Sequence, residues 1–169
     1  MAQFVSAQEA AAMIKDDSVL GLCGFGLGGF AEEVAAAIGN RFVEEGHPRN
    51  LHIRQSGSLG VPKERGPVHF AQEGLISCWT TAMIGFNFKL GKLVSENKIK
   101  CYCLPQGILI NLWRESARRS PGFITKVGLG TFADPRIEGG KMNDITTEDL
   151  VDLMEIDGEE FLRYRNIYP

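Results

Sequence analysis

The chain has 169 residues and a formal net charge of −3, with 44% hydrophobic and 23% charged residues. This length suits one domain or part of a larger one, and these proportions are those of an ordinary globular protein. No apolar run reaches the roughly 18 residues of a membrane span, the N-terminus lacks the pattern of a signal peptide, and no basic patch favours nucleic acid. The sequence therefore predicts a cytoplasmic protein that binds neither membrane nor nucleic acid and keeps its cysteines as thiols.

The first half of the chain predicts strands that alternate with helices. Ser6-Ala-Gln-Glu9 has the spacing of a capping box and begins an alanine-rich helix that we expect to end at about Lys15. Residues 18–23 are typical of a buried strand, and a glycine-rich loop follows. The next helix, from about residue 30, carries one apolar stripe formed by Phe30, Val34, Ile38 and Phe42.

The same alternation continues to residue 129. We expect strands at 51–55, 75–80, 99–104 and 123–129 and helices at 90–97 and 108–119. This order indicates an α/β fold with an open, mostly parallel sheet and helices on both of its faces. Loops 24–29, 56–60 and 105–107 each follow a strand, so we expect them to meet at the carboxyl edge of the sheet, where such folds bind ligands.

The tail has a different pattern. Two β-type runs, 151–156 and 159–164, flank Asp157-Gly158, a pair that favours the type I′ turn of a β-hairpin. A helix that starts near Thr147 is the alternative for the first of these runs.

The stretch GLCGFGLGGF, residues 21–30, contains five glycines. Gly24, Gly26 and Gly29 satisfy G-x-G-x-x-G between a strand and a helix, which is the dinucleotide-binding pattern. That interpretation needs an acidic residue at the end of the next strand, which here reads Leu-His-Ile-Arg-Gln, and Glu32 and Glu33 would oppose a phosphate at the start of the helix. The loop therefore makes room for something thin and neutral, offers backbone amide N–H groups slightly ahead of the helix, or only lets the strand and helix pack closely.

Four segments follow one another along the chain: GLCGFGLGGF at 21–30, AQEGL at 71–75, LPQG at 104–107, and VGLGTFADPR through GGKMN at 127–143. Together they resemble the family I coenzyme A transferases, in particular their acetate and propionate (short-chain acyl) branch. The resemblance covers nearly the whole chain in order. It implies that residues 1–169 are one domain, the larger part of the amino-terminal CoA-transferase domain, with the sheet incomplete at its C-terminal end.

The resemblance also implies a reaction. CoA passes from a short-chain acyl-CoA to a free carboxylic acid through a glutamyl-CoA thioester on the enzyme, and oxyanions formed on the way need N–H donors. In the family the glutamate lies in the second half, in a Glu-x-Gly-like motif that we do not find here. We therefore assign no catalytic residue in this chain and expect the isolated chain to be inactive; Glu73 is expected to be a capping or surface carboxylate.

Site residues follow from the matched motifs. The resemblance implies that the glycine loop lines the active-site edge and that Gln106, beside Gly107, contacts the reacting carboxylate. Arg136 is expected to hold its own loop by pairing with Asp134 or a carbonyl. The loop residues concerned are Gly24, Phe25, Gly26, Gly28 and Gly29.

Expected ligands and partners follow as well. No metal and no permanent cofactor is implied, because CoA and acyl-CoA are substrates, and Cys101 and Cys103 are expected to be apolar thiols. Expected partners are acyl-CoA, a short-chain carboxylate, the missing C-terminal half or second subunit, and further copies of the chain. The chain is then a fragment, a truncated gene product or a subunit of a split enzyme. The alternatives are a non-enzymatic small-molecule sensor of the same α/β superfamily and a piece of a dinucleotide-binding oxidoreductase.

Overall fold

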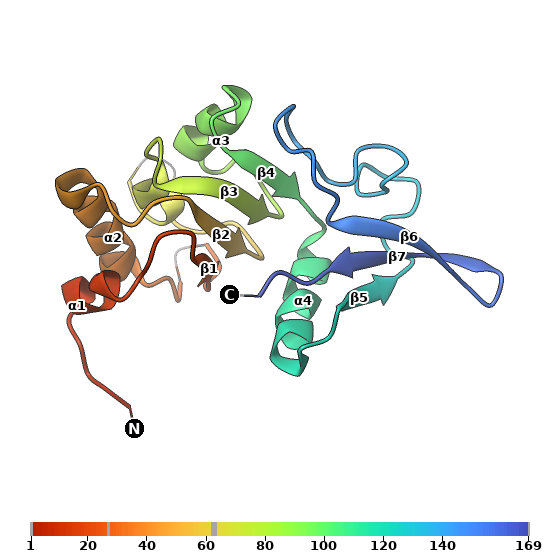
Figure 1. The fold of residues 1–169 in the computed structure, drawn as a ribbon, viewed down its shortest axis with the longest axis horizontal. Helices are drawn as coiled ribbons and strands as arrows, with labels where there is room; N and C mark the ends of the chain where they lie inside the picture. Colours follow the sequence, from red (N-terminus) through yellow and green to blue (C-terminus); the bar gives the residue numbers. More distant parts are fainter. Residues whose placement is uncertain (1, 27, 62–63, 169) are drawn as a thin grey trace.

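The computed structural model describes residues 2–26, 28–61 and 64–168, which form two sheets with helices around them (Figure 1). The helices are α1 (Ala7–Ala12), α2 (Glu32–Glu45), η1 (Pro67–Phe70), α3 (Phe88–Ser95) and α4 (Gln106–Arg118). The strands are β1 (Val19–Leu22), β2 (Leu51–Gln55), β3 (Ile76–Thr81), β4 (Lys100–Cys103), β5 (Gly122–Thr125), β6 (Val151–Ile156) and β7 (Glu159–Arg165).

The first sheet is parallel and has the strand order β1-β2-β3-β4. Because each strand pairs with the next one along the chain, right-handed crossovers place α2, η1 and α3 on the same face. On that face Ile53 and Trp79 pack in one buried cluster with Ile38 and Leu90. Helix α4 covers the opposite face, where its leucines join Tyr102 in a second cluster. The α/β prediction with helices on both faces is confirmed.

The second sheet is antiparallel and has the order β5-β7-β6. Asp157 and Gly158 both have left-handed φ, 53° and 79°, which confirms the predicted hairpin and excludes the helix from Thr147. The run 123–129, which the alternation would have added to the parallel sheet, forms only the short β5 and lies beside β7 instead. Helix α4 already has the length of a parallel crossover, so the connection does not decide the partner of β5; the strand pairs with the β7 edge of a hairpin that lies far along the chain.

The stretch 127–146 fastens the second sheet to β4. Its backbone pairs with β4, since the Cys103 amide donates to the Gly140 carbonyl at 2.8 Å. Asn143 donates to the carbonyls of Val94 and Ile99, at 2.8 and 2.9 Å. The last of the four segments that carry the family resemblance therefore has a structural role.

Asp134 and Arg136 organise the turn inside that stretch. The predicted pairing is confirmed, with Arg136 Nη2 donating to Asp134 Oδ2 at 2.8 Å. Asp134 is 1% exposed, and the guanidinium beside it holds the pKa of the carboxyl well below its usual range. The pair fixes its own loop, as expected.

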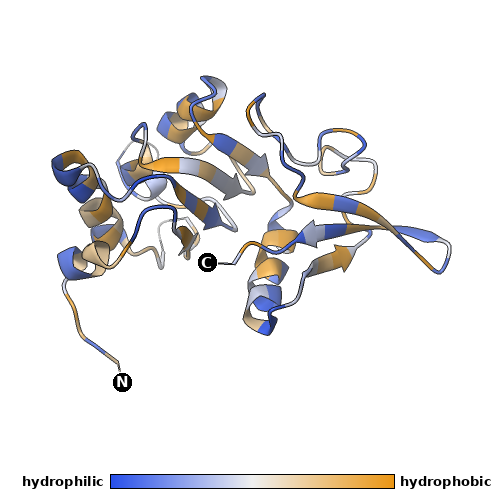
Figure 2. Cartoon of the chain, viewed as in Figure 1, coloured by the Kyte–Doolittle hydropathy of each residue, from blue (hydrophilic) through white to orange (hydrophobic). Residues whose placement is uncertain are grey.

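Helix boundaries differ from the predicted ones by a few residues. The capping box of Ser6 and Glu9 is present, and α2 begins at Glu32, with its predicted stripe on the core side. Figure 2 shows α2 and α4 with hydrophobic and hydrophilic residues in alternation, as expected for helices with one buried face. Within the described ranges, none of the helices has the length and hydropathy needed to cross a bilayer.

Candidate functional site

Three loops meet at the carboxyl edge of the parallel sheet, as expected. The glycine loop after β1 is tied to the loop after β2, because the Gly26 amide donates to the Ser58 carbonyl at 2.8 Å and the Gly26 carbonyl accepts from the Gly60 amide at 2.7 Å. The start of α4 reaches the same place. A Cβ at Gly57 would lie 2.9 Å from Gln106 Nε2 and 3.2 Å from the Phe25 ring. Gly57 is thus the point where the three segments touch.

The glycine loop is a tight turn with an open outer surface. Gly24 has a φ of 128°, and a Cβ there would lie 2.8 Å from the Gly28 carbonyl oxygen. Phe25 and Gly28 exchange both of their backbone hydrogen bonds at 3.0 Å. Nothing lies within 4 Å of a Cβ built at Gly26, and Phe25 is 71% exposed. Leu27, inside the G-x-G-x-x-G stretch, lies outside the described residues.

This loop uses its own amides to hold its shape. The N–H groups of Phe25, Gly26 and Gly28 all donate to carbonyls of the protein. The expectation that the loop offers its amide N–H groups to a ligand is therefore wrong for these three residues, which form a thin, open surface instead. Gly21, the first glycine of the stretch, has a packing role toward a different helix from the one expected, since a Cβ there would lie 2.7 Å from the Trp113 ring of α4.

The amino end of α2 is already occupied by acidic side chains. Glu32 Oε2 accepts from the Gly66 amide at 2.8 Å, and Glu32 Oε1 lies 2.7 Å from His69 Nε2. Glu33, also in the first turn, is exposed. Two carboxylates thus complement the positive end of the helix dipole, and a docked phosphate would meet them. The geometry disfavours the dinucleotide alternative.

The amino end of α4 is open by contrast. The helix begins at Gln106, two residues before the predicted start, so Gln106 and Gly107 lie in its first turn rather than in a loop. That turn contains no acidic residue and no side-chain cap. Both residues are exposed, and the Gln106 side chain makes no hydrogen bond with any residue that the structure describes. Pro105 is the N-cap of α4, and because proline lacks the N–H that a helix interior needs, it marks the boundary that sequence reasoning could have used.

This arrangement can stabilise negative charge. A helix amino end carries a partial positive charge, and an exposed amide side chain adds an N–H donor beside it. Preorganised donors of this kind stabilise oxyanions in acyl transfer. At this edge the start of α4 exposes the Gln106 amide, and the glycine loop forms the neighbouring surface.

The remaining candidate side chains lie elsewhere. Glu73, just before β3, is at the opposite edge of the sheet and pairs with Lys98 at 2.9 Å, as expected for a surface carboxylate. Burial lowers the pKa of His52 to about 4 and raises that of the Cys78 thiol to about 12. Cys101 is buried and Cys103 half-buried. Among the described residues, no three His, Cys, Asp or Glu side chains gather in a way that could hold a metal ion.

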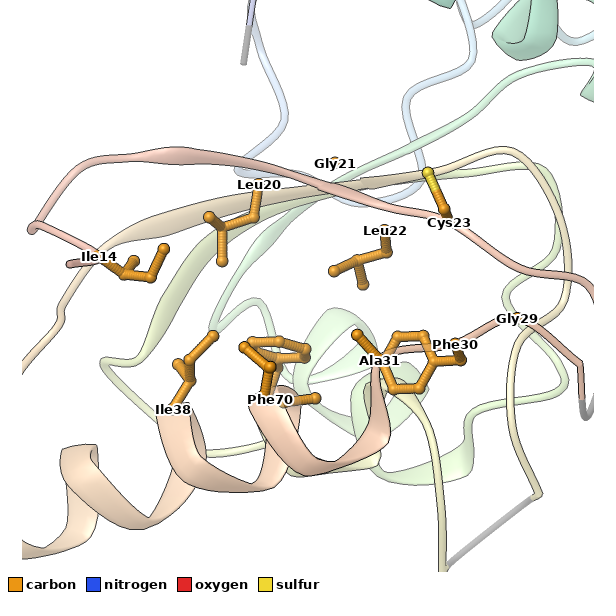
Figure 3. A pocket seen from close by; sticks show the side chains of 12 residues that line it. Ile14, Leu20, Gly21, Leu22, Cys23, Gly29, Phe30, Ala31, Ile38 and Phe70 are labelled. Atoms are coloured by element: carbon orange, nitrogen blue, oxygen red, sulfur yellow. The ribbon is translucent and has the colours of Figure 1, made fainter. Parts of the chain in front are cut away.

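An apolar pocket of about 230 Å³ lies under the start of the glycine loop, between β1 and α2. Figure 3 shows Leu20 and Leu22 of β1 directed toward Ile38 and Phe70, while the Cys23 thiol points the other way. No charged side chain lines it. The pocket suits an apolar group and offers no donor for a phosphate or carboxylate.

Comparison with known proteins gives consistent matches. Residues 4–167 match the coenzyme A transferase family. The chain is 54% identical over 166 residues to a caffeate CoA-transferase of Acetobacterium woodii, covering 98% of this chain and 32% of that protein. It is 40% identical over 167 residues to the acetate CoA-transferase YdiF of Escherichia coli K12, covering 98% of this chain and 31% of that protein.

A solved structure matches the fold over the same length. The crystal structure of the acyl-CoA transferase YdiF from E. coli O157:H7, in a thioester complex with CoA, superimposes with a TM-score of 0.93 at 40% identity, covering 98% of this chain and 32% of that one. The chain thus spans about a third of the length of these relatives. Fold, motifs and family match agree, and the chain belongs to the coenzyme A transferase family.

Proposed function

We propose that residues 1–169 are the larger part of the amino-terminal domain of a CoA-transferase that moves CoA from a short-chain acyl-CoA to a free carboxylic acid. The observation that carries this proposal is the uncapped amino end of α4, with the exposed Gln106 amide, beside the thin wall of the glycine loop. The E. coli relative that shares this fold forms a thioester with CoA.

In the proposed reaction a glutamate carboxylate of the enzyme attacks the carbonyl carbon of the acyl-CoA and displaces CoA as a thiolate, which gives an acyl-glutamyl anhydride. The thiolate then attacks the glutamyl carbonyl, so that the acyl group leaves as a free carboxylate and a glutamyl-CoA thioester forms. The incoming acid then takes the CoA. Attack on each carbonyl places negative charge on its oxygen, and a fixed N–H donor lowers the energy of that state. Gln106 Nε2, next to the dipole of α4, is the donor that we assign to this oxygen.

We place the nucleophilic glutamate outside this chain, in the part of the longer relatives that the chain does not span. Glu73 is at the wrong edge of the sheet, and Glu32 is engaged with Gly66 and His69. The isolated chain is therefore inactive, and its partner is the remainder of the enzyme or a second subunit. Turnover by the purified 169-residue chain would contradict this placement.

The proposal extends to assembly and location. Among the described residues β1 pairs with β2 alone, which leaves its other edge, with the sequence Val-Leu-Gly-Leu, open to a further strand or a second copy. All four cysteines are free thiols, which suits the reducing cytoplasm. Size-exclusion chromatography with light scattering measures the self-association, and a strictly monomeric chain would contradict that part.

A chimera tests the activity. Residues 4–167 replace the matching third of the A. woodii caffeate CoA-transferase, and CoA exchange from acetyl-CoA to propionate is measured, with caffeate as a second acceptor. We expect exchange to propionate from the folded chimera. A folded chimera without exchange to either acid would refute the proposed function, and exchange to caffeate alone would refute the short-chain assignment.

A further inference from the structure

The loop after β2, residues 55–60, carries no sequence motif, yet it lies between the glycine loop and α4. Gln55 ends β2 and is 1% exposed, and its Nε2 donates to the Gly57 carbonyl at 2.9 Å. Gln55 Oε1 and Ser58 Oγ are buried and have no hydrogen-bond partner among residues 2–26, 28–61 and 64–168. Two unpaired buried polar atoms in one short loop are unusual, and both can accept an N–H or O–H group.

Gly57 is constrained by contacts and not by its backbone. Its φ is not left-handed, so alanine can adopt the same conformation. A Cβ there would nevertheless lie 2.9 Å from Gln106 Nε2 and 3.2 Å from Phe25 Cδ2. Both neighbours are side-chain ends that can move, so the added methyl group would displace them without breaking the fold.

We propose that Gln55 and Gly57 are positioning residues for Gln106. Gln55 holds the Gly57 carbonyl, and the missing side chain at Gly57 leaves the place in which the Gln106 amide rests beside the glycine loop. This inference deepens the proposed function and rests on it for its catalytic part. The geometric part, in which Gly57 determines the position of the Gln106 amide, depends only on the contacts of Gly57 described above.

Displacement of the amide predicts a specific kinetic effect. A donor acts on the transition state only when it is held within about half an ångström of its place. Gly57→Ala is therefore expected to lower kcat by roughly 10- to 100-fold with little change in KM. Gln55→Met, which keeps the length of the side chain but removes its N–H donor, is expected to act in the same direction and less strongly.

The geometric part is tested on the 169-residue chain by NMR. The side-chain amide resonances of Gln106 are identified by their loss in Gln106→Ala. We expect Gly57→Ala to shift them and Gly85→Ala, where the added Cβ has nothing within 4 Å, to leave them in place. Unshifted Gln106 resonances in a folded Gly57→Ala chain would overturn the proposal, whether or not the chain belongs to an active enzyme.

The catalytic part is tested in the chimera by a double-mutant cycle. If Gly57 acts through Gln106, Gly57→Ala lowers kcat in the wild-type background and has no further effect in the Gln106→Ala background. Gly85→Ala is the matched control and leaves kcat unchanged. Equal effects of Gly57→Ala in both backgrounds would overturn the positioning role. An inactive wild-type chimera would instead refute the proposed function and leave the NMR result to decide the geometry.

Discussion

Helices α2 and α4 begin at the same edge of the sheet, but the backbone groups at their amino ends have different surroundings. At α2 the first turn carries Glu32 and Glu33, and Glu32 is bonded to Gly66 and His69. At α4 the first turn has no acid and no side-chain cap, and it exposes Gln106. The amino end of α2 is thus engaged in contacts within the protein, whereas the amino end of α4 is exposed.

In the site that we propose, the N–H donor lies at the start of α4 and not in the more conspicuous glycine loop. In the glycine loop before α2, the amides of Phe25, Gly26 and Gly28 donate hydrogen bonds to carbonyls of the protein. The Pro-Gln-Gly segment at the start of α4 has no side-chain cap and exposes the Gln106 side chain. Each of the following predictions changes a residue at one of these two helix starts or in the glycine loop beside them.

The largest effect is expected from the loss of the donor at α4. In the chimera, Gln106→Ala removes the amide assigned to the oxyanion and should lower kcat for CoA exchange by about 10²–10³-fold. Gln8→Ala, an exposed glutamine on α1, is the matched control and should leave the rate unchanged. A kcat within threefold of the wild-type value would remove Gln106 from the mechanism.

The next effect comes from making α4 resemble α2. Gly107→Glu places a carboxylate in the first turn of α4, where a built Cβ has nothing within 4 Å. The charge should favour the helix dipole but repel the developing oxyanion, so we expect exchange to fall roughly 10- to 100-fold while thermal stability is maintained. Gly85→Glu adds the same charge at an exposed position in the loop between β3 and α3, outside any helix start. Equal rates for the two variants would show that α4 does not face negative charge.

A smaller effect, on stability alone, is expected in the glycine loop. Gly24→Ala combines a φ of 128° with a contact of 2.8 Å to the Gly28 oxygen, and should cost about 2 kcal/mol of unfolding free energy. Gly28→Ala has an ordinary φ and no neighbour nearer than 3.8 Å, so its cost should stay below about 0.5 kcal/mol. Urea denaturation of the chain measures both. Similar costs would mean that the turn is not constrained as described.

The smallest effect is expected at the acids of α2. Glu32→Gln weakens the bonds to Gly66 and His69 and should cost about 1 kcal/mol, a value reduced by the partial exposure of the pair. Glu33→Gln, at an exposed position in the same turn, should be close to neutral. The same denaturation experiment compares them. If Glu33→Gln costs as much as Glu32→Gln, the two acids act through the helix dipole and not through the loop at 66–69.

The candidate site could be predicted only in outline. The three loops at one edge follow from a parallel sheet, and the structure brings them together. The start of α4 at Gln106 was missed, because a sequence such as Pro-Gln-Gly suits a turn as well as a first helical turn. Gly57 was predicted only as part of the loop 56–60 and Gln55 only as the end of a strand, because the contacts of Gly57 with Phe25 and Gln106 join segments that are distant in the sequence.

The sequence by itself determined the features that depend on neighbours a few residues apart. The capping box of Ser6 and Glu9, the apolar stripe of α2 and the Asp157-Gly158 hairpin were all predicted, because each is stabilised within one turn or one pair of strands. Only the tertiary structure decided which sheet β5 joins, which helix start stays open and which glycine receives the Gln106 amide. Those outcomes depend on packing between distant segments, which local propensity does not encode.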